Sequence, residues 1–239
     1  MLHKTKGIVL RVIPYNDKNK IVKIYTENFG LLSFITSVGN SKSTRQKAAL
    51  LQPLQPIFLE LKPNDANKIH RLGEINLLIS LNKCAQDYYK RLIILFLNEV
   101  LYKCLRAEEK ENSLFNFLIT SLQILEEIET GIGNFPLAFI CNLTKYLGIA
   151  PQNNYSDKQC YFNSQEGYFQ SYSSEHKLVD IEPSKQLSKV LNLNYNNLSE
   201  MSLNSLQRKE ILNLMMTYYT YHLPSFSDIN SLEVMEELS

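Results

Sequence analysis

The first 80 residues consist of short apolar runs separated by polar turns, a pattern typical of β-strands. These runs predict strands at 7–14, 20–26, 31–38, 57–62 and 69–78, the last with a bulge at Gly73. Residues 39–49 carry almost no apolar side chain, so we expect a basic loop there. Short strands closing on a small core fit an OB-type barrel best, and an open sandwich or an SH3-like barrel also satisfies the pattern.

From residue 84 onward the apolar period changes from that of a strand to that of a helix. Apolar side chains at helical spacing predict a helix after residue 84 and further helices at 112–130, 135–147, 205–222 and 231–238. Residues 152–181 differ: they predict a small inserted β-ribbon with strands at 160–162 and 167–169. The fold class is therefore α+β, with an OB-fold domain at 1–80 and an α-helical domain at 81–239.

Charge is divided between these two regions. Residues 1–79 hold 12 Lys and Arg against 5 Asp and Glu, whereas residues 80–239 hold 13 against 19. The net charges of +7 and −6 nearly cancel in the whole-chain value of +1. A small basic β-module joined to an acidic helical body predicts a protein that binds a polyanion such as a nucleic acid.

The basic residues of the predicted barrel are the candidate DNA contacts. They are Arg11, Lys18, Lys20, Lys23, Lys42, Arg45 and Lys47. Cations spread over strands and loops can neutralise successive phosphates, and the competing interpretation is that these charges only hydrate the surface. The interleaved aromatic residues Tyr15, Tyr25, Phe29 and Phe34 could stack on bases, but alternation along strands favours core packing for most of them.

The sequence contains no pattern that predicts catalysis, and we expect a protein that is not an enzyme and needs no cofactor. No Walker-type loop or His-Glu-x-x-His motif occurs, and we expect the four histidines at the surface or capping helices. The carboxylates Glu126, Glu127 and Glu129 are expected on a solvated helix face. The four cysteines are not arranged in close pairs, so we expect reduced thiols and no metal site; they are Cys84, Cys104, Cys141 and Cys160. The sequence shows no secretion signal, and we therefore expect a cytoplasmic protein.

Several motifs, taken in order, resemble the RecO family of bacterial recombination mediators. The first part of the resemblance is a strand at 6–11, a Tyr-containing polar turn at 15–20 and a Thr-Glu-x-x-Gly turn at 26–30. The later parts are Leu-Gln-Pro at 51–53, Leu-Gly-x-x-Pro at 147–151, Tyr-Tyr-Thr-Tyr-His-Leu at 218–223 and Ser-Leu-Glu-Val at 231–234. Each motif is weakly specific, but their order and spacing extend over nearly the whole chain.

This resemblance implies binding to single- and double-stranded DNA and annealing of complementary strands. It also implies partnership with RecR and with the acidic tail of single-stranded-DNA-binding protein (SSB), so that RecA can load on coated gaps. An apolar groove in the helical domain would receive that tail, and its candidate cations are Lys90, Arg91, Lys103, Arg106 and Lys145. The competing interpretation for each of them is ordinary surface charge. Two alternatives stay open on charge and fold alone: an RNA-binding OB module and a non-catalytic protein–protein adaptor.

One segment departs from the family pattern. Many members carry four cysteines after the Leu-Gly-x-x-Pro motif, as a zinc ribbon, whereas here only Cys160 follows it. A single thiolate cannot hold a structural zinc ion. We therefore expect a degenerate ribbon in which aromatic packing by residues such as Phe162 and Phe169 replaces the metal.

Overall fold

The computed structural model describes residues 3–61, 69–105, 110–174, 177–224, 226 and 229–231. The chain forms two compact units. The first comprises Met1–Asp87 and Leu97–Glu126, and the second comprises Tyr88–Phe96 and Glu127–Ser239. In the part that is described, no helix is both long and apolar enough to cross a membrane.

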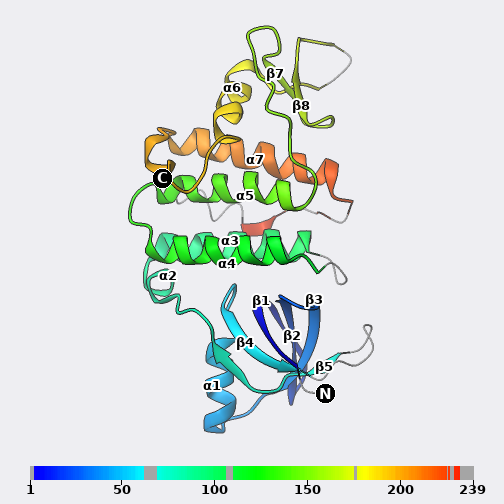
Figure 1. The fold of residues 1–239 in the computed structure, drawn as a ribbon, viewed down its shortest axis with the longest axis vertical. Coiled ribbons are helices and arrows are strands. Elements are labelled where there is room, and N and C mark those ends of the chain that lie inside the picture. Colours follow the sequence, from blue (N-terminus) through cyan, green and yellow to red (C-terminus); the bar gives the residue numbers. More distant parts are fainter. Residues whose placement is uncertain are drawn as a thin grey trace. The chain divides into compact units, whose positions relative to one another are not determined.

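The first unit contains a six-stranded sheet that curls into a half-barrel (Figure 1). Its strands are β1 (His3–Asn16), β2 (Asn19–Thr26), β3 (Gly30–Ser37), β4 (Pro56–Leu61), β5 (His70–Arg71) and β6 (Ile75–Leu77). The spatial order is β5-β3-β2-β1-β4-β6, with β3 and β5 parallel and the other pairs antiparallel. The buried core includes Val9, Val22, Ile24, Phe34 and Ile57. This architecture is the predicted OB-type module.

Two local predictions for this module are wrong. The expected basic loop at 39–49 contains a helix, α1 (Lys42–Leu50), which buries none of its residues. It has no apolar stripe to reveal it, but the Ser41 side chain caps it by accepting from the Thr44 N–H. The expected strand at 69–78 is divided around Gly73 into β5 and β6, because the chain changes partner there from β3 to β4.

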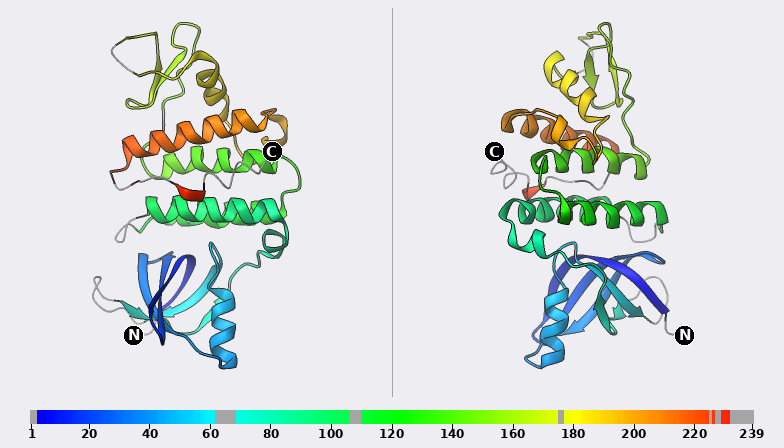
Figure 2. Two further views of the ribbon diagram at one scale, coloured as in Figure 1. Left: turned by 180° about the vertical axis from the view of Figure 1, so that it is seen from behind. Right: turned by 60° about the vertical axis from the view of Figure 1, so that its left-hand side comes forward.

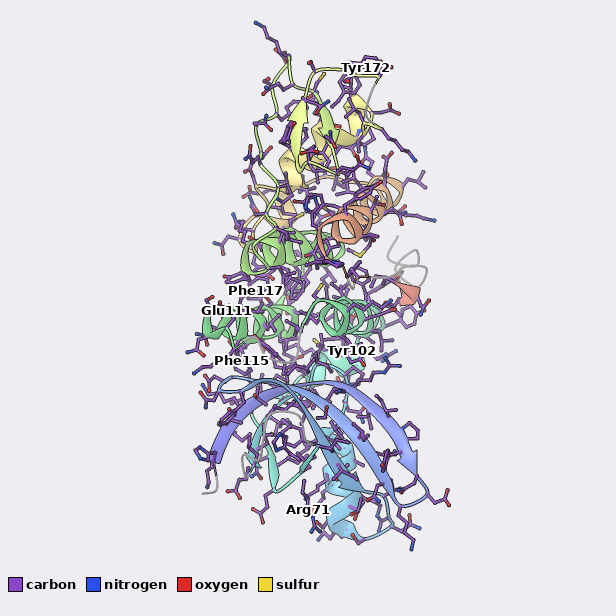
Figure 3. The ribbon with its side chains drawn as sticks, turned by 90° about the vertical axis from the view of Figure 1, so that its right-hand side faces the viewer. Arg71, Tyr102, Glu111, Phe115, Phe117 and Tyr172 are labelled. Carbon is purple, nitrogen blue, oxygen red and sulfur yellow. The ribbon has the colours of Figure 1, made fainter. Side chains whose placement is uncertain are left out.

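The face of the sheet that points away from the barrel core also packs against residues of the first unit. Helix α2 (Asn82–Gln86) follows the sheet, and α3 (Tyr88–Cys104) and α4 (Asn112–Glu127) come next along the chain. The Tyr25 ring lies 6.1 Å from that of Phe115, and the Arg11 guanidinium lies 4.8 Å from the centre of the Tyr102 ring (Figure 3). The sheet therefore has one face on its own core and the other against helical residues.

The second unit is mainly helical. It contains η1 (Ile132–Asn134), α5 (Phe135–Tyr146), α6 (Ile181–Val190), η2 (Leu198–Glu200) and α7 (Ser205–His222). Helices α5 and α7 run side by side (Figure 2), and the Tyr219 hydroxyl donates to the Ile140 carbonyl at 2.7 Å. The helices predicted at 135–147 and 205–222 are confirmed, α6 was not predicted, and almost all of the predicted helix at 231–238 lies outside the described residues.

The predicted ribbon is present as β7 (Tyr161–Asn163) paired with β8 (Tyr168–Gln170). Its core is aromatic: the rings of Phe162 and Phe169 are fully buried with centroids 5.0 Å apart, and Phe162 also contacts Tyr218 of α7. Gly167 lies at the turn with φ +78°, and a Cβ there would come within 3.0 Å of the Tyr218 hydroxyl. Aromatic side chains thus hold this ribbon together and attach it to α7.

Two polar side chains expected at the surface are buried instead. Glu126 is 7% exposed, and its carboxylate accepts hydrogen bonds from the backbone N–H groups of Lys83 at 2.7 Å and Cys84 at 2.9 Å. His70 is 5% exposed and lies against the Phe34 ring, at 5.8 Å between centroids. Both predictions were wrong because local polarity does not reveal partners that come from distant segments.

Candidate nucleic-acid interface

Two adjoining hollows lie where α1 meets the ends of β2 and β3. The larger has a volume of about 460 Å³ and the smaller of about 260 Å³. They share the side chains of Thr36, Ser37, Thr44 and Lys47. We call the two together the basic groove.

Four cations line the basic groove: Lys20, Arg45, Lys47 and Arg71. Lys20 pairs with Thr36 across β2 and β3, and alternation places it on the same face as the core residues Val22 and Ile24. Lys20 therefore lies where the barrel core ends and the groove begins.

Arg45 and Lys47 come from α1, and Arg71 comes from β5. The Lys47 ammonium donates to the Gly73 carbonyl at 2.8 Å, which ties the last turn of α1 to the β5–β6 connection. Arg71 pairs in register with Ile35 of β3 and lines the smaller hollow together with Thr44 and Lys47 of α1. Three separate segments thus bring their positive charges to one site.

The remaining lining favours an anion. Hydroxyl groups of Thr36, Ser37, Ser43 and Thr44 can donate hydrogen bonds, and no Asp or Glu is among the described residues that line either hollow. Four positive charges without a lining carboxylate create a positive local potential. The groove can therefore bind phosphate groups, and Lys and Arg bonded to phosphate oxygens would do so with charge-assisted hydrogen bonds.

The other predicted cations lie elsewhere in the first unit. Arg11 and Lys23 are cross-strand partners on the opposite face of the sheet, where Arg11 lies over Tyr102 and Lys23 donates to the Ser33 hydroxyl at 2.7 Å. Lys18 is exposed in the β1–β2 turn, and its carbonyl accepts from the N–H of Val38, a groove residue. Lys42 is exposed in the first turn of α1. Three of the seven predicted residues are thus gathered in the basic groove.

Most of the barrel aromatics are placed in the core. Tyr25 and Phe34 are 1% and 0% exposed, and Phe29 is partly buried against the core. Tyr15 is 57% exposed and is free to meet a base from the solvent side. The preference for core packing is confirmed for Tyr25 and Phe34.

Sequence reasoning missed Arg71. It lies in the segment predicted as the fifth strand, but only the parallel pairing of β5 with β3 brings it to Ile35 and the smaller hollow. Its positive charge was visible in the sequence, whereas the long-range pairing that places it was not.

The cations proposed for a tail-binding groove differ widely in environment. Lys90 is buried, Lys103 forms an ion pair with Glu99 at 3.1 Å, Lys145 donates to Asn142 at 2.9 Å, and Arg106 lies outside the described residues. Arg91 is exposed, and its guanidinium lies 5.8 Å from the centre of the Tyr88 ring. These cations do not share one environment: Lys145 and Arg91 are both exposed, and the Arg91 guanidinium lies over an aromatic ring.

Arg91 belongs to an apolar surface on the first half of α3. Tyr88, Tyr89 and Leu95 are between 44% and 48% exposed, and Tyr88, Arg91 and Leu95 share one helix face. We call these four residues the α3 patch. It combines exposed apolar area with one positive charge.

Burial lowers the reactivity expected of two of the four thiols, Cys104 and Cys141. Burial raises the pKa of the Cys141 thiol to about 12, and it also raises the pKa of Cys104. Both thiols are therefore protonated at neutral pH. Across the described ranges, no group of three or more His, Cys, Asp and Glu side chains could hold a metal ion.

Comparison with known proteins assigns both halves of the chain. A family model described as "Recombination protein O N terminal" matches residues 1–80, and one described as "Recombination protein O C terminal" matches residues 85–232. Curated relatives named "DNA repair protein RecO" from Azobacteroides pseudotrichonymphae and Phocaeicola vulgatus are each 33% identical over 239 residues, covering 100% of this chain and 99% of theirs. A relative of the same name from Bacteroides fragilis is 33% identical over 240 residues.

Proposed function

The chain belongs to the RecO family of DNA repair proteins, and we propose that it is a recombination mediator that binds and anneals single-stranded DNA through the basic groove. In this role it also binds double-stranded DNA, RecR and the acidic C-terminal tail of SSB, and it helps RecA to load on SSB-coated gaps in the cytoplasm. It makes and breaks no covalent bond. The family supplies the partners, and the charged lining of the groove supplies the physical basis for binding DNA.

The observation that carries this proposal is the set of cations Lys20, Arg45, Lys47 and Arg71 in one groove. Each phosphate that these side chains neutralise would release a condensed counterion. For a single strand, each such contact adds about 0.7 to the slope of log affinity against log salt concentration. Phosphates carry no sequence information, so affinity should be similar for different base sequences.

The test is fluorescence anisotropy of a labelled single strand across a salt series. We expect Lys20→Glu and Arg45→Glu to weaken binding and to lower the salt slope by at least about 0.7 each, for all base sequences alike. Lys23→Glu changes the net charge equally on the opposite face of the sheet, so it is the matched control and should have a smaller effect. If Lys23→Glu weakened binding more than both groove variants, the groove would not be the DNA site.

The α3 patch is the proposed site for the SSB tail. An acidic peptide that ends in apolar residues suits a surface where the Arg91 guanidinium lies over the Tyr88 ring and Tyr89 and Leu95 are exposed on the same half of α3. We expect Arg91→Glu to weaken binding of a labelled SSB tail peptide, with Lys158→Glu, an exposed cation before the ribbon, as the control. Equal affinities for the two variants would contradict this assignment.

The same binding assays decide between the competing functions. Tail-peptide binding without DNA binding would favour the adaptor. A preference for structured RNA over single-stranded DNA would favour the RNA-binding module. Salt-sensitive DNA binding together with tail-peptide binding supports the mediator.

A further inference from the structure

The two hollows of the basic groove differ in chemical character. The larger is mostly apolar, because Val12, Pro14, Val38, Ala48 and Leu51 contribute to its lining. The smaller is mostly polar and is lined by Asn19, Ser43 and Arg71 in addition to the shared residues. A groove that only neutralised phosphates would not need an apolar compartment.

We propose that the larger hollow receives one unstacked base of a single strand and that the smaller hollow receives an adjacent phosphate. This inference rests on the proposed function and adds the way in which the groove distinguishes unpaired from paired DNA. The ligand is a single-stranded polynucleotide, because it alone presents accessible base faces next to regularly spaced negative charges.

Exposure of apolar groups supports a base in the larger hollow. Val38 is 44% exposed and Pro14 is also exposed, so both present apolar atoms to water at the groove. Covering them with the face of a base would remove this area from water. Such apolar contacts do not depend on base identity, so the larger hollow would accept any base.

The shared residues place the phosphate. Lys47 lines both hollows, and its bond to the Gly73 carbonyl holds its ammonium near the β5–β6 connection, next in sequence to Arg71 and Leu72 of the smaller hollow. Thr36 and Thr44 also line both hollows, so a sugar-phosphate linkage that passes from one hollow to the other would run past these two residues. Lys20 and Arg45 also line the larger hollow, where they would contact the phosphate of a neighbouring nucleotide.

A duplex cannot use the larger hollow in this way. Its bases are stacked and paired, and bringing one out costs the energy of unstacking and unpairing. Double-stranded DNA would therefore contact the cations alone. The groove would thus favour single strands while still tolerating duplex.

The test compares two labelled strands of equal length and charge, oligothymidine and a strand made only of abasic sites, by anisotropy at one moderate salt concentration. We expect the intact protein to bind oligothymidine about five- to tenfold more tightly. The double variant Pro14→Ser with Val38→Ser should reduce this ratio to about one, whereas Arg71→Glu should weaken binding of both strands. Tyr15→Ser is the control, because Tyr15 is an exposed aromatic residue that does not line either hollow.

Two outcomes would overturn the inference and leave the proposed function intact. In the first, the intact protein binds both strands equally while Lys20→Glu weakens both, so that the groove binds phosphates only. In the second, Tyr15→Ser abolishes the preference and the double variant does not, so that bases stack on Tyr15 instead. If neither strand binds, the proposed DNA-binding function fails as well.

Discussion

Replacing Glu126 should destabilise the first unit, because this buried carboxylate supplies the cap of α2. The residue before α2 is Leu81, whose side chain cannot accept a hydrogen bond, and the structure shows no side-chain cap from it. Instead the two carboxylate oxygens of Glu126 accept from the N–H groups of Lys83 and Cys84, in the first turn of the helix. A residue from α4 thus completes a helix more than 40 positions earlier in the chain, with sequence separations of 43 and 42.

The magnitude follows from these two bonds. A hydrogen bond to a charged group contributes about 1.5–3 kcal/mol, and a typical helix cap contributes about 1 kcal/mol. Water can replace part of the loss, so we expect Glu126→Ala to lower the free energy of unfolding by about 2–4 kcal/mol. Glu126→Gln keeps one carbonyl oxygen and should lower it by about half as much.

The assay is urea denaturation followed by far-ultraviolet circular dichroism and by tyrosine fluorescence, since the chain has 14 Tyr and no Trp. Glu129→Ala is the matched control: Glu129 is exposed, and its loss should change the free energy of unfolding by less than about 0.5 kcal/mol. The reasoning is refuted if Glu126→Ala and Glu129→Ala shift the urea midpoint equally. A graded series from Glu to Gln to Ala would support it.

Three further predictions concern other buried groups. His70→Leu should raise the free energy of unfolding by about 1–2 kcal/mol in the same assay, because neither ring nitrogen of His70 has a hydrogen-bond partner among the described residues; a loss of stability would contradict this. Burial raises the pKa of the Tyr218 phenol to about 12, above the value of about 10 in an unfolded chain, so the free energy of unfolding should fall as pH rises from about 10 to about 12. Tyr218→Phe should make that fall smaller, and an unchanged fall would assign it to other groups. A thiol reagent should modify Cys160 in the native protein and all four cysteines in urea, because Cys84, Cys104 and Cys141 are buried; fast native reaction of a second thiol would argue against this packing.

The sequence by itself determined the type of most elements and the family. Short apolar runs bounded by polar turns predicted β1 to β4, and helical periodicity predicted α5 and α7, because apolar side chains of each element are buried in a core. The ribbon at Tyr161–Asn163 and Tyr168–Gln170 was visible as a change in composition. The resemblance to the RecO family, which rested on the order of short motifs, is confirmed by the comparisons.

Only the tertiary structure decided where individual polar side chains lie. Helix α1 buries none of its residues, so its sequence has no apolar stripe from which a helix could be predicted. The structure shows that the helix begins after Ser41, whose side chain caps it. Arg71 reaches the basic groove through a parallel strand pairing, while Arg11 is placed on the far face of the sheet against Tyr102. Periodicity reports whether an element has a buried face, but the partners of a charge are set by contacts between segments far apart in the chain, which no local pattern records.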